Sequence, residues 1–282
     1  MTRRTGFAAA ALTVAVFGAG GCAKAWPSAP ELYVAPTAQG MVVVEGGWLR
    51  PSGRAAPSDD CATALSRKVH RAVAVCARAE PEACAIAATG SFTEDEVLRC
   101  ARSRGAVTPT REPWRGREVL RLRSTTREGR ARAEVVFLRP SVVIVGAREA
   151  VDPMLDAALA SSGRAELPAA VRDEWRALPA SAPVRGVIRL DPRGMLPGAT
   201  AVRLWSDRGP TTSMHAALRC EGEAAARDLS RAIEPLARGA SSLMAGAQGF
   251  EVAHRVEGAT VFVDLSRARP GDDRAPAPSR AP

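Results

Sequence analysis

The chain has 282 residues, 46% of them hydrophobic and 24% charged, and a formal net charge of +9. This length is sufficient to bury a sizeable core, as one large domain or two small ones. The positive charge is almost entirely Arg. It is scattered along the sequence and not gathered into a strip with aromatic residues, so the sequence argues against a nucleic-acid-binding protein.

The first residues have the layout of a secretory signal peptide. Two arginines precede an apolar run, Phe7–Phe17, and a stretch of small residues leads to Cys22. The run is too short to span a bilayer, which takes roughly 20 apolar residues. The layout therefore indicates an exported protein.

The stretch Gly18–Cys22 resembles the lipobox of bacterial lipoproteins, although Ala19 stands where that family usually has Leu. The resemblance implies that residues 1–21 are removed, that the Cys22 thiol is lipidated and that the protein is anchored in a membrane. In that family an Asp after the cysteine favours the inner membrane. Ala23 therefore implies the outer membrane, facing the periplasm or the cell surface. The alternative is an ordinary signal peptide, with Cys22 as an additional thiol.

After the signal region the sequence predicts a tether and then the first folded elements. Three prolines between residues 22 and 38 favour an extended tether. The β-branched run Met41–Val44 predicts a strand. A serine that can cap a helix, followed by apolar residues at helical spacing, predicts a helix over residues 59–78.

Four cysteines fall within forty residues, Cys61, Cys76, Cys84 and Cys100, and Cys220 lies far from them. None of their spacings is that of a zinc site, so we expect no metal there. An exported chain matures in an oxidising compartment, and two disulfides are therefore expected. Of the three possible connectivities we favour Cys76–Cys84, across a short turn, and Cys61–Cys100. Cys220 is then a buried, inert thiol.

The middle of the chain predicts several strands and three helices. Thr93 and Glu96 form a capping box that opens a helix over residues 94–104. Two further helices are expected between residues 146 and 163 and over residues 168–178. Strands are predicted over residues 84–90, 107–113, 118–122, 132–138 and 142–145.

The C-terminal part continues the same alternation. A long helix begins at about Glu223, and Pro235 should kink it. Residues 266–282 are rich in Arg, Pro, Asp and Ala, which predicts a disordered tail. Strands are predicted over residues 184–190, 201–205, 212–220, 250–256 and 260–265.

The order strand, helix, strand, strand occurs twice, over residues 84–122 and 212–265. Units of this kind usually form an antiparallel or mixed sheet with helices on one face. We therefore expect an α+β fold of ferredoxin-like character, mostly antiparallel, with its helices on one face. The repeat divides the folded part into a first unit, residues 39–180, and a second unit, residues 181–265.

Two segments resemble uncharacterised secreted proteins and lipoproteins of high-GC bacteria. One is Val142–Val151, which leads from a strand into a helix, and the other is Leu178–Pro183, which precedes the next strand. The resemblance covers about residues 40–265. It implies an exported protein but no particular activity.

The sequence contains no G-x-S-x-G, P-loop, H-E-x-x-H or S-x-x-K motif. His215, His254 and Cys220 fall in the second repeat unit and are weak candidates for a metal or nucleophile site. Ordinary strand histidines are the alternative, because no carboxylate in the sequence is placed to orient them. Asp152 and Asp156, four residues apart on a predicted helix, have the pattern of a solvated surface.

These observations favour a non-catalytic, membrane-anchored envelope lipoprotein that binds a protein or another envelope component. We expect no cofactor and no nucleic-acid partner. Two alternatives remain, an envelope hydrolase with a dispersed active site and an Arg-mediated binder of an anionic envelope polymer. A pocket with histidines or clustered carboxylates would favour the hydrolase, and a contiguous Arg face would favour the polymer binder.

Overall fold

The computed structural model describes residues 26–48, 61–78, 83–103, 107–125, 131–138, 140–161, 167–194, 196–208, 213–245 and 250–267. The first half of the chain contributes seven strands, β1 (Gly40–Glu45), β2 (Val69–Cys76), β3 (Cys84–Gly90), β4 (Val107–Trp114), β5 (Arg117–Thr125), β6 (Ala131–Leu138) and β7 (Val142–Gly146). Its helices are the 3-10 helix η1 (Pro30–Tyr33), α1 (Cys61–Ser66), α2 (Glu94–Ser103) and α3 (Arg148–Ala160). The second half contributes α4 (Arg172–Arg176), β8 (Val184–Arg189), β9 (Ala199–Ser206), β10 (Ser213–Cys220), α5 (Glu223–Ala245), β11 (Phe250–Glu257) and β12 (Thr260–Arg267).

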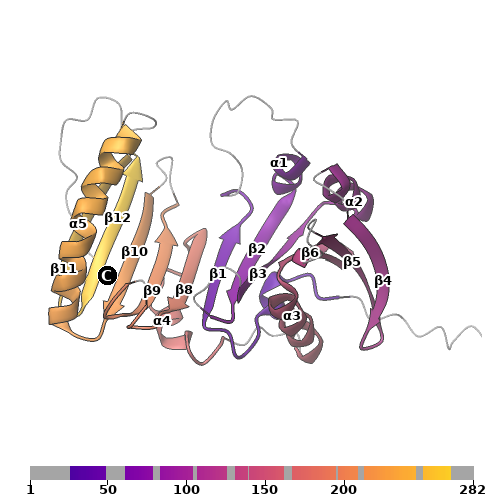
Figure 1. The fold of residues 1–282 in the computed structure, drawn as a ribbon, viewed down its shortest axis with the longest axis horizontal. Coiled ribbons are helices and arrows are strands. Elements are labelled where there is room, and N and C mark those ends of the chain that lie inside the picture. The colour runs from indigo at the N-terminus through magenta and orange to yellow at the C-terminus, as the bar shows by residue number, and fades with distance from the viewer. Residues whose placement is uncertain are drawn as a thin grey trace, which may run out of the picture.

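All twelve strands of the described residues form one sheet in the order β11-β12-β10-β9-β8-β1-β2-β3-β7-β6-β5-β4. Every pair of neighbouring strands is antiparallel. Figure 1 shows β11 with α5 at one end of the sheet and β4 at the other. The predicted units 39–180 and 181–265 meet where β1 pairs with β8, so a single sheet runs through both. The fold class is α+β.

Two rows of directly paired residues cross the whole sheet, one residue per strand, and define its two faces. The α3 face contains the row Thr110, Arg121, Val136, Ile144, Ala87, Val73, Val43, Arg185, Trp205, His215, Asp264 and Ala253. The α5 face contains the row Pro109, Leu122, Val135, Val145, Ile86, Ala74, Val42, Gly186, Leu204, Ala216, Val263 and His254.

Helices cover parts of both faces, so the expectation of helices on one face is wrong. On the α3 face, Val151 and Leu155 of α3 and Tyr33 of η1 join the main core cluster with the central strands. On the α5 face, α2 packs on β5 and β6, and α5 packs on β10 and β12. The physical reason lies in the strands themselves. Successive residues such as Val42 and Val43 are both apolar, and a strand that is apolar on both sides favours cover on both sides.

The repeated unit is present as an order of elements, but the two units differ in how their strands are arranged in the sheet, and ferredoxin-like repeats are not confirmed. In the second unit only β12 lies between β10 and β11, whereas in the first unit β7, β6 and β5 all lie between β3 and β4. In both units a helix, α5 or α2, connects two strands that run in the same direction. Three strands lie between this parallel pair in the first unit, and one strand lies between it in the second unit. The order of elements along the chain does not show this difference.

The helix predicted over residues 59–78 is wrong in its greater part. Only α1 is helical, and Val69–Cys76 form strand β2. Four-residue spacing of apolar side chains favoured a helix, but this segment is also rich in Val. It lies between β1 and β3 and forms backbone ladders with both. Such pairing outweighs local helical spacing.

The tether predicted over residues 22–38 is not extended from Trp26 onward. Trp26 is 5% exposed, Tyr33 is fully buried, and both belong to the main core cluster. The Tyr33 hydroxyl donates to the carbonyl oxygen of Pro27 (2.8 Å), and burial raises the pKa of Tyr33. This segment therefore covers part of the α3 face. Cys22 lies outside the described residues.

The predictions for the cysteines are confirmed. The disulfides are Cys61–Cys100, which joins α1 to α2, and Cys76–Cys84, which joins β2 to β3. They indicate maturation in an oxidising, exported environment. Cys220 is a buried free thiol whose pKa is raised by its burial. The predicted tail, residues 266–282, lies outside the described residues except for its first two, which complete β12. Within the described part of the chain, no helix has the length and apolarity needed to span a membrane.

Candidate functional site

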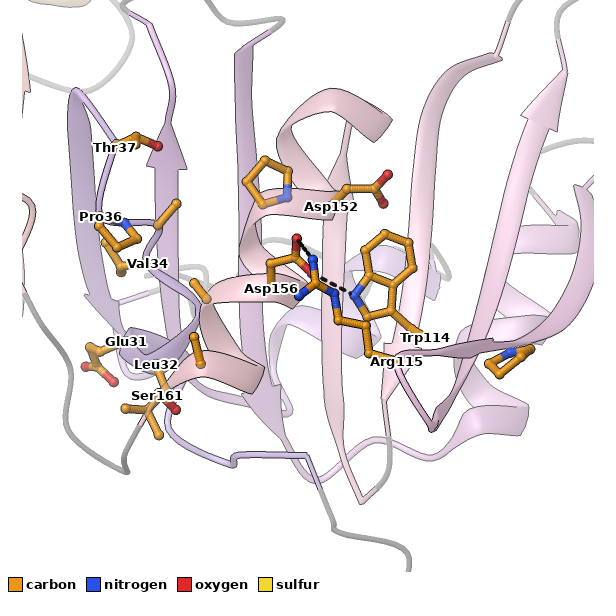
Figure 2. A pocket seen from close by; sticks show the side chains of 15 residues that line it. Glu31, Leu32, Val34, Pro36, Thr37, Trp114, Arg115, Asp152, Asp156 and Ser161 are labelled. Atoms are coloured by element: carbon orange, nitrogen blue, oxygen red, sulfur yellow. Dashed lines mark hydrogen bonds and ion pairs between the residues drawn. The ribbon is translucent and has the colours of Figure 1, made fainter.

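A pocket of about 690 Å³ opens between η1 and the loop that follows it, the β4–β5 hairpin and α3 (Figure 2). This volume lies within the range of pockets that bind small molecules. Most of its lining is apolar, supplied by prolines, alanines and Trp114. Its polar lining residues are Glu31, Thr37, Arg115, Asp152, Asp156 and Ser161.

The hairpin tip is held against α3 by a shared carboxylate. The indole Nε1 of Trp114 donates to Oδ1 of Asp156 (3.2 Å), and Nη2 of Arg115 donates to Oδ2 (2.8 Å). Both contacts are drawn in Figure 2. The tip is a two-residue turn in which Arg115 (φ 47°) and Gly116 (φ 83°) both have positive φ, as a type I′ hairpin requires. Arg115 therefore occupies a strained backbone region while its guanidinium contacts the helix.

Next to the hairpin and α3, Arg121 of β5 lies fully buried among three carboxylates. Its Nη1 donates to Oε2 of Glu134 (2.6 Å), its Nη2 donates to Oδ1 of Asp152 (2.9 Å), and it forms an ion pair with Glu112. Its guanidinium also lies 4.9 Å from the centre of the Trp114 ring. Burial alone would lower the pKa of Arg121, but the contacts with Asp152 and Glu134 outweigh it and raise the pKa. The network fixes both Trp114 and Asp152, which line the pocket.

Each carboxylate of the pocket has an arginine partner. Glu31 pairs with Arg71, Asp156 pairs with Arg115, and Asp152 pairs with Arg121. The pocket thus offers fixed carboxylate acceptors. Asp152 and Asp156 are 28% and 40% exposed, in keeping with the predicted solvated helix surface, and in addition β5 and the hairpin tip supply them with partners that are remote in sequence.

The structure places His215 in a separate polar cluster on the α3 face. Its Nδ1 lies 2.7 Å from Oδ1 of Asp264, its Nε2 lies 3.0 Å from Oδ2 of Asp207, and its ring stacks on Trp205 with centroids 5.3 Å apart. Burial alone would lower the pKa of His215, but the hydrogen bonds to Asp264 and Asp207 outweigh it and raise the pKa. Since both ring nitrogens contact carboxylates, this arrangement leaves neither of them open to a metal or a substrate.

The weak candidates His215, His254 and Cys220 are not brought together. His254 lies in the row of the α5 face and His215 in the row of the α3 face. Cys220 belongs to the core beneath α5. On β10 the residue in the same row as His254 is Ala216, and Cys220 lies four residues further along that strand. Among the described residues, no group of three or more His, Cys, Asp or Glu side chains could hold a metal ion.

The arginines of the second half are interleaved with carboxylates. On the α3 face, Arg203 and Arg219 both contact Glu174 of α4, and Arg255 contacts Asp264 (2.9 Å). This part of the surface carries mixed charge and is not a contiguous cationic face. The arrangement gives little support to binding of an anionic polymer.

The α5 face has an apolar strip between its helices. Ile86 of β3 and Val145 of β7 are paired neighbours, 48% and 40% exposed. In the order of the sheet, the residues of their row are apolar on all strands except β11, where the row ends at His254. Ile86 and Val145 are the exposed large hydrophobic side chains of the described residues, and an exposed apolar patch can mark an interaction surface. The described residues give no indication of the partner that would cover it.

Sequence reasoning missed the pocket. Its walls come from three segments, residues 31–37, 113–115 and 152–161. The first was interpreted as a tether, although Leu32, Tyr33 and Val34 form an apolar group that could have indicated packing.

Comparison of the chain with family models, with curated proteins and with solved structures finds no match.

Proposed function

We propose that this protein is a membrane-anchored envelope lipoprotein that binds an envelope component in the pocket beside Trp114. The observation that supports the proposal is the pocket itself. Its volume of about 690 Å³, its mainly apolar lining and its few convergent polar groups are those of a ligand-binding site. The envelope setting rests on the signal-like N-terminus and agrees with the two disulfides.

Binding without catalysis is the simpler function for this site. A catalytic carboxyl group must reach the reacting atoms with a free oxygen, and a neighbouring guanidinium already occupies part of its hydrogen-bonding capacity. Asp152, Asp156 and Glu31 all have such a neighbour. His215, the histidine with two carboxylate contacts, belongs to a different cluster. The hydrolase alternative therefore has less support than the binding protein.

The proposed lipid anchor would hold the pocket close to the membrane. Trp26 is buried against the β4–β5 hairpin, where its Nε1 donates to the carbonyl oxygen of Glu118 (3.2 Å) and Arg117 lies over its ring. Four residue steps of at most about 3.6 Å separate Cys22 from Trp26, a reach of about 14 Å. The hairpin tip that lines the pocket would then belong to the membrane-proximal side, on the outer membrane by the same proposal.

Membrane fractionation of the Cys22→Ser variant tests the anchor. We expect the variant in the soluble fraction and the unchanged protein in the membrane fraction. Cys220→Ser is the matched control, because it removes a thiol that is buried and remote from the N-terminus. Continued membrane association of Cys22→Ser would refute the anchor.

Co-purification from the native envelope tests the binding site. The full chain is isolated from its own envelope, and the co-purified material is identified by mass spectrometry. Ala160→Trp, at an exposed position that lines the pocket, should displace that material, and Ala157→Phe serves as a second pocket-filling variant. Ala232→Trp, at an exposed position on α5, is the control. The same material on all of these proteins would contradict the pocket as the binding site.

A further inference from the structure

We infer that the ligand of the Trp114 pocket is an uncharged, hydroxyl-rich molecule with apolar faces, that is, a saccharide. The inference rests on the proposed function, because it names the chemical class of ligand that the same pocket would take. It follows from three properties of the lining: an excess of acceptors, an internal balance of charge and a rigid apolar wall.

Hydrogen-bond acceptors predominate among the polar groups of the pocket. Three carboxylates and two hydroxyl groups line it, against a single guanidinium, that of Arg115. An ionised carboxylate only accepts hydrogen bonds, and its two oxygens offer about four acceptor positions. Oδ1 and Oδ2 of Asp156 each use one such position, for Trp114 and Arg115. The ligand that suits this lining is rich in donors.

The balance of charge in the pocket favours a ligand whose donors are hydroxyl groups over a cationic ligand. Asp152 accepts from the buried Arg121 and also pairs with Arg148 (3.4 Å), and the other two carboxylates have Arg71 and Arg115. A cationic ligand would meet carboxylates whose charge is already compensated, and close approach would bring it near these guanidinium groups. A neutral hydroxyl uses the remaining acceptor positions without displacing an ion pair.

The apolar wall suits the C–H faces of a sugar ring. It includes Trp114, Pro36, Pro113, Pro153 and Ala157. Proline and alanine lose little side-chain entropy when a ligand covers them. The indole of Trp114 is already fixed by its bond to Asp156 and by Arg121 on its ring, so its ordering adds little further cost. A preordered apolar surface next to fixed acceptors matches a molecule that has hydroxyl edges and aliphatic faces.

Calorimetric titration of the full chain tests the inference. The probes are chitotriose, maltotriose, a neutral glycan hydrolysate of the native envelope and, as the cationic comparison, spermidine. We expect a neutral saccharide to bind with an affinity that changes less than twofold between 50 and 500 mM NaCl, because charge-pair binding is what salt screens (~8 Å Debye length at 0.15 M). Spermidine should not compete with it.

Variants locate the binding. Asp156→Ala should weaken saccharide binding about tenfold, through loss of its acceptors and of the hydrogen bond that fixes Trp114. Asp156→Asn, which keeps one acceptor oxygen, should lose less and covers the case in which the alanine variant is unstable. Asp173→Ala, an exposed carboxylate on α4 with a side chain 92% exposed, is the control.

The outcomes also separate this inference from the proposed function. Failure of every neutral saccharide to bind, or salt-sensitive binding of spermidine in the pocket, overturns the saccharide inference. If Ala160→Trp still removes a co-purified component that is not a glycan, the proposed function stands and the inference alone fails. If no variant of the pocket changes any binding, both fail.

Discussion

Arg121 on β5 and Asp152 on α3 form an ion pair of 2.9 Å that connects the interior of the sheet to the helix that lines the pocket. Arg121 is fully buried, while the Asp152 side chain is 28% exposed and reaches the pocket. A single guanidinium thus links the stability of this end of the sheet to the geometry of the candidate site.

Removal of Arg121 should destabilise the protein strongly. Arg121→Leu leaves Glu134, whose side chain is 4% exposed, with Arg123 as its remaining ion-pair partner. Breaking a buried charge pair from one side costs about 3 kcal/mol or more. Urea unfolding measures the loss. The double variant Arg121→Leu with Glu134→Leu should recover part of it, because no buried carboxylate remains, and a double variant as unstable as the single one would contradict this account.

The His215 cluster should make stability depend on pH. The folded-state pKa of His215 is raised, so its contribution is fully present below the unfolded value of about 6.5 and is lost as the pH rises through the folded value. Asp207, Asp264 and Arg255, which contacts Asp264, are the charged groups facing this cluster.

We therefore expect His215→Asn to cost about 1.5–3 kcal/mol at pH 5.5, as for hydrogen bonds to charged groups, and less at high pH. Urea midpoints across this range are the measurement. His254→Asn is the matched control on the opposite face, and it should leave this pH dependence in place. A loss that grows toward high pH would show the opposite sign and refute the assignment.

Adjacent residues of β3 should respond in opposite ways to the same substitution. Ile86 is 48% exposed on the α5 face, and Ala87 is fully buried on the α3 face. Ile86→Lys should change the unfolding free energy by less than about 1 kcal/mol, as is usual for surface positions. Ala87→Lys should prevent folding, since it buries an unpaired charge. Thermal unfolding compares the two, and a folded Ala87→Lys would mean that the faces are wrongly assigned.

The two disulfides should differ in their contribution to stability. Cys61–Cys100 closes a sequence separation of 39 and Cys76–Cys84 one of 8. In the chain-entropy account the longer loop contributes about 1.4 kcal/mol more. Unfolding of the paired variants, Cys61→Ala with Cys100→Ala and Cys76→Ala with Cys84→Ala, measures the difference. Equal losses would mean that native-state effects outweigh loop entropy.

Local signals in the sequence predicted much of the fold. The capping box of Thr93 and Glu96 predicted the start of α2, and the structure contains both of its reciprocal hydrogen bonds (3.3 and 3.0 Å). The strands predicted over residues 107–113 and 118–122 are present as β4 and β5, and Gly116 in the turn between them has a positive φ. These features depend on neighbours within a few residues, so a sequence alone contains them.

Features that depend on distant pairing were not predictable in the same way. Val69–Cys76 have both helical spacing and strand propensity, and only the neighbouring strands β1 and β3 decide between them. The pocket depends on the position of β4 at the edge of the sheet, separated from β3 by three other strands, and on the contact of its hairpin tip with Asp156 of α3. No local pattern around Asp156 indicates that contact.

The pairing of β1 with β8 has a consequence for export. Strand β1 is the first strand among the described residues, yet one of its edges is paired by a strand that begins at Val184. A chain crossing a membrane from its N-terminus would present Met41–Val44 as an open, apolar edge until that later strand has emerged. Unpaired edges of this kind template aggregation. A chain truncated before β8 should therefore need protection by a chaperone, while the complete chain closes the edge with its own second half.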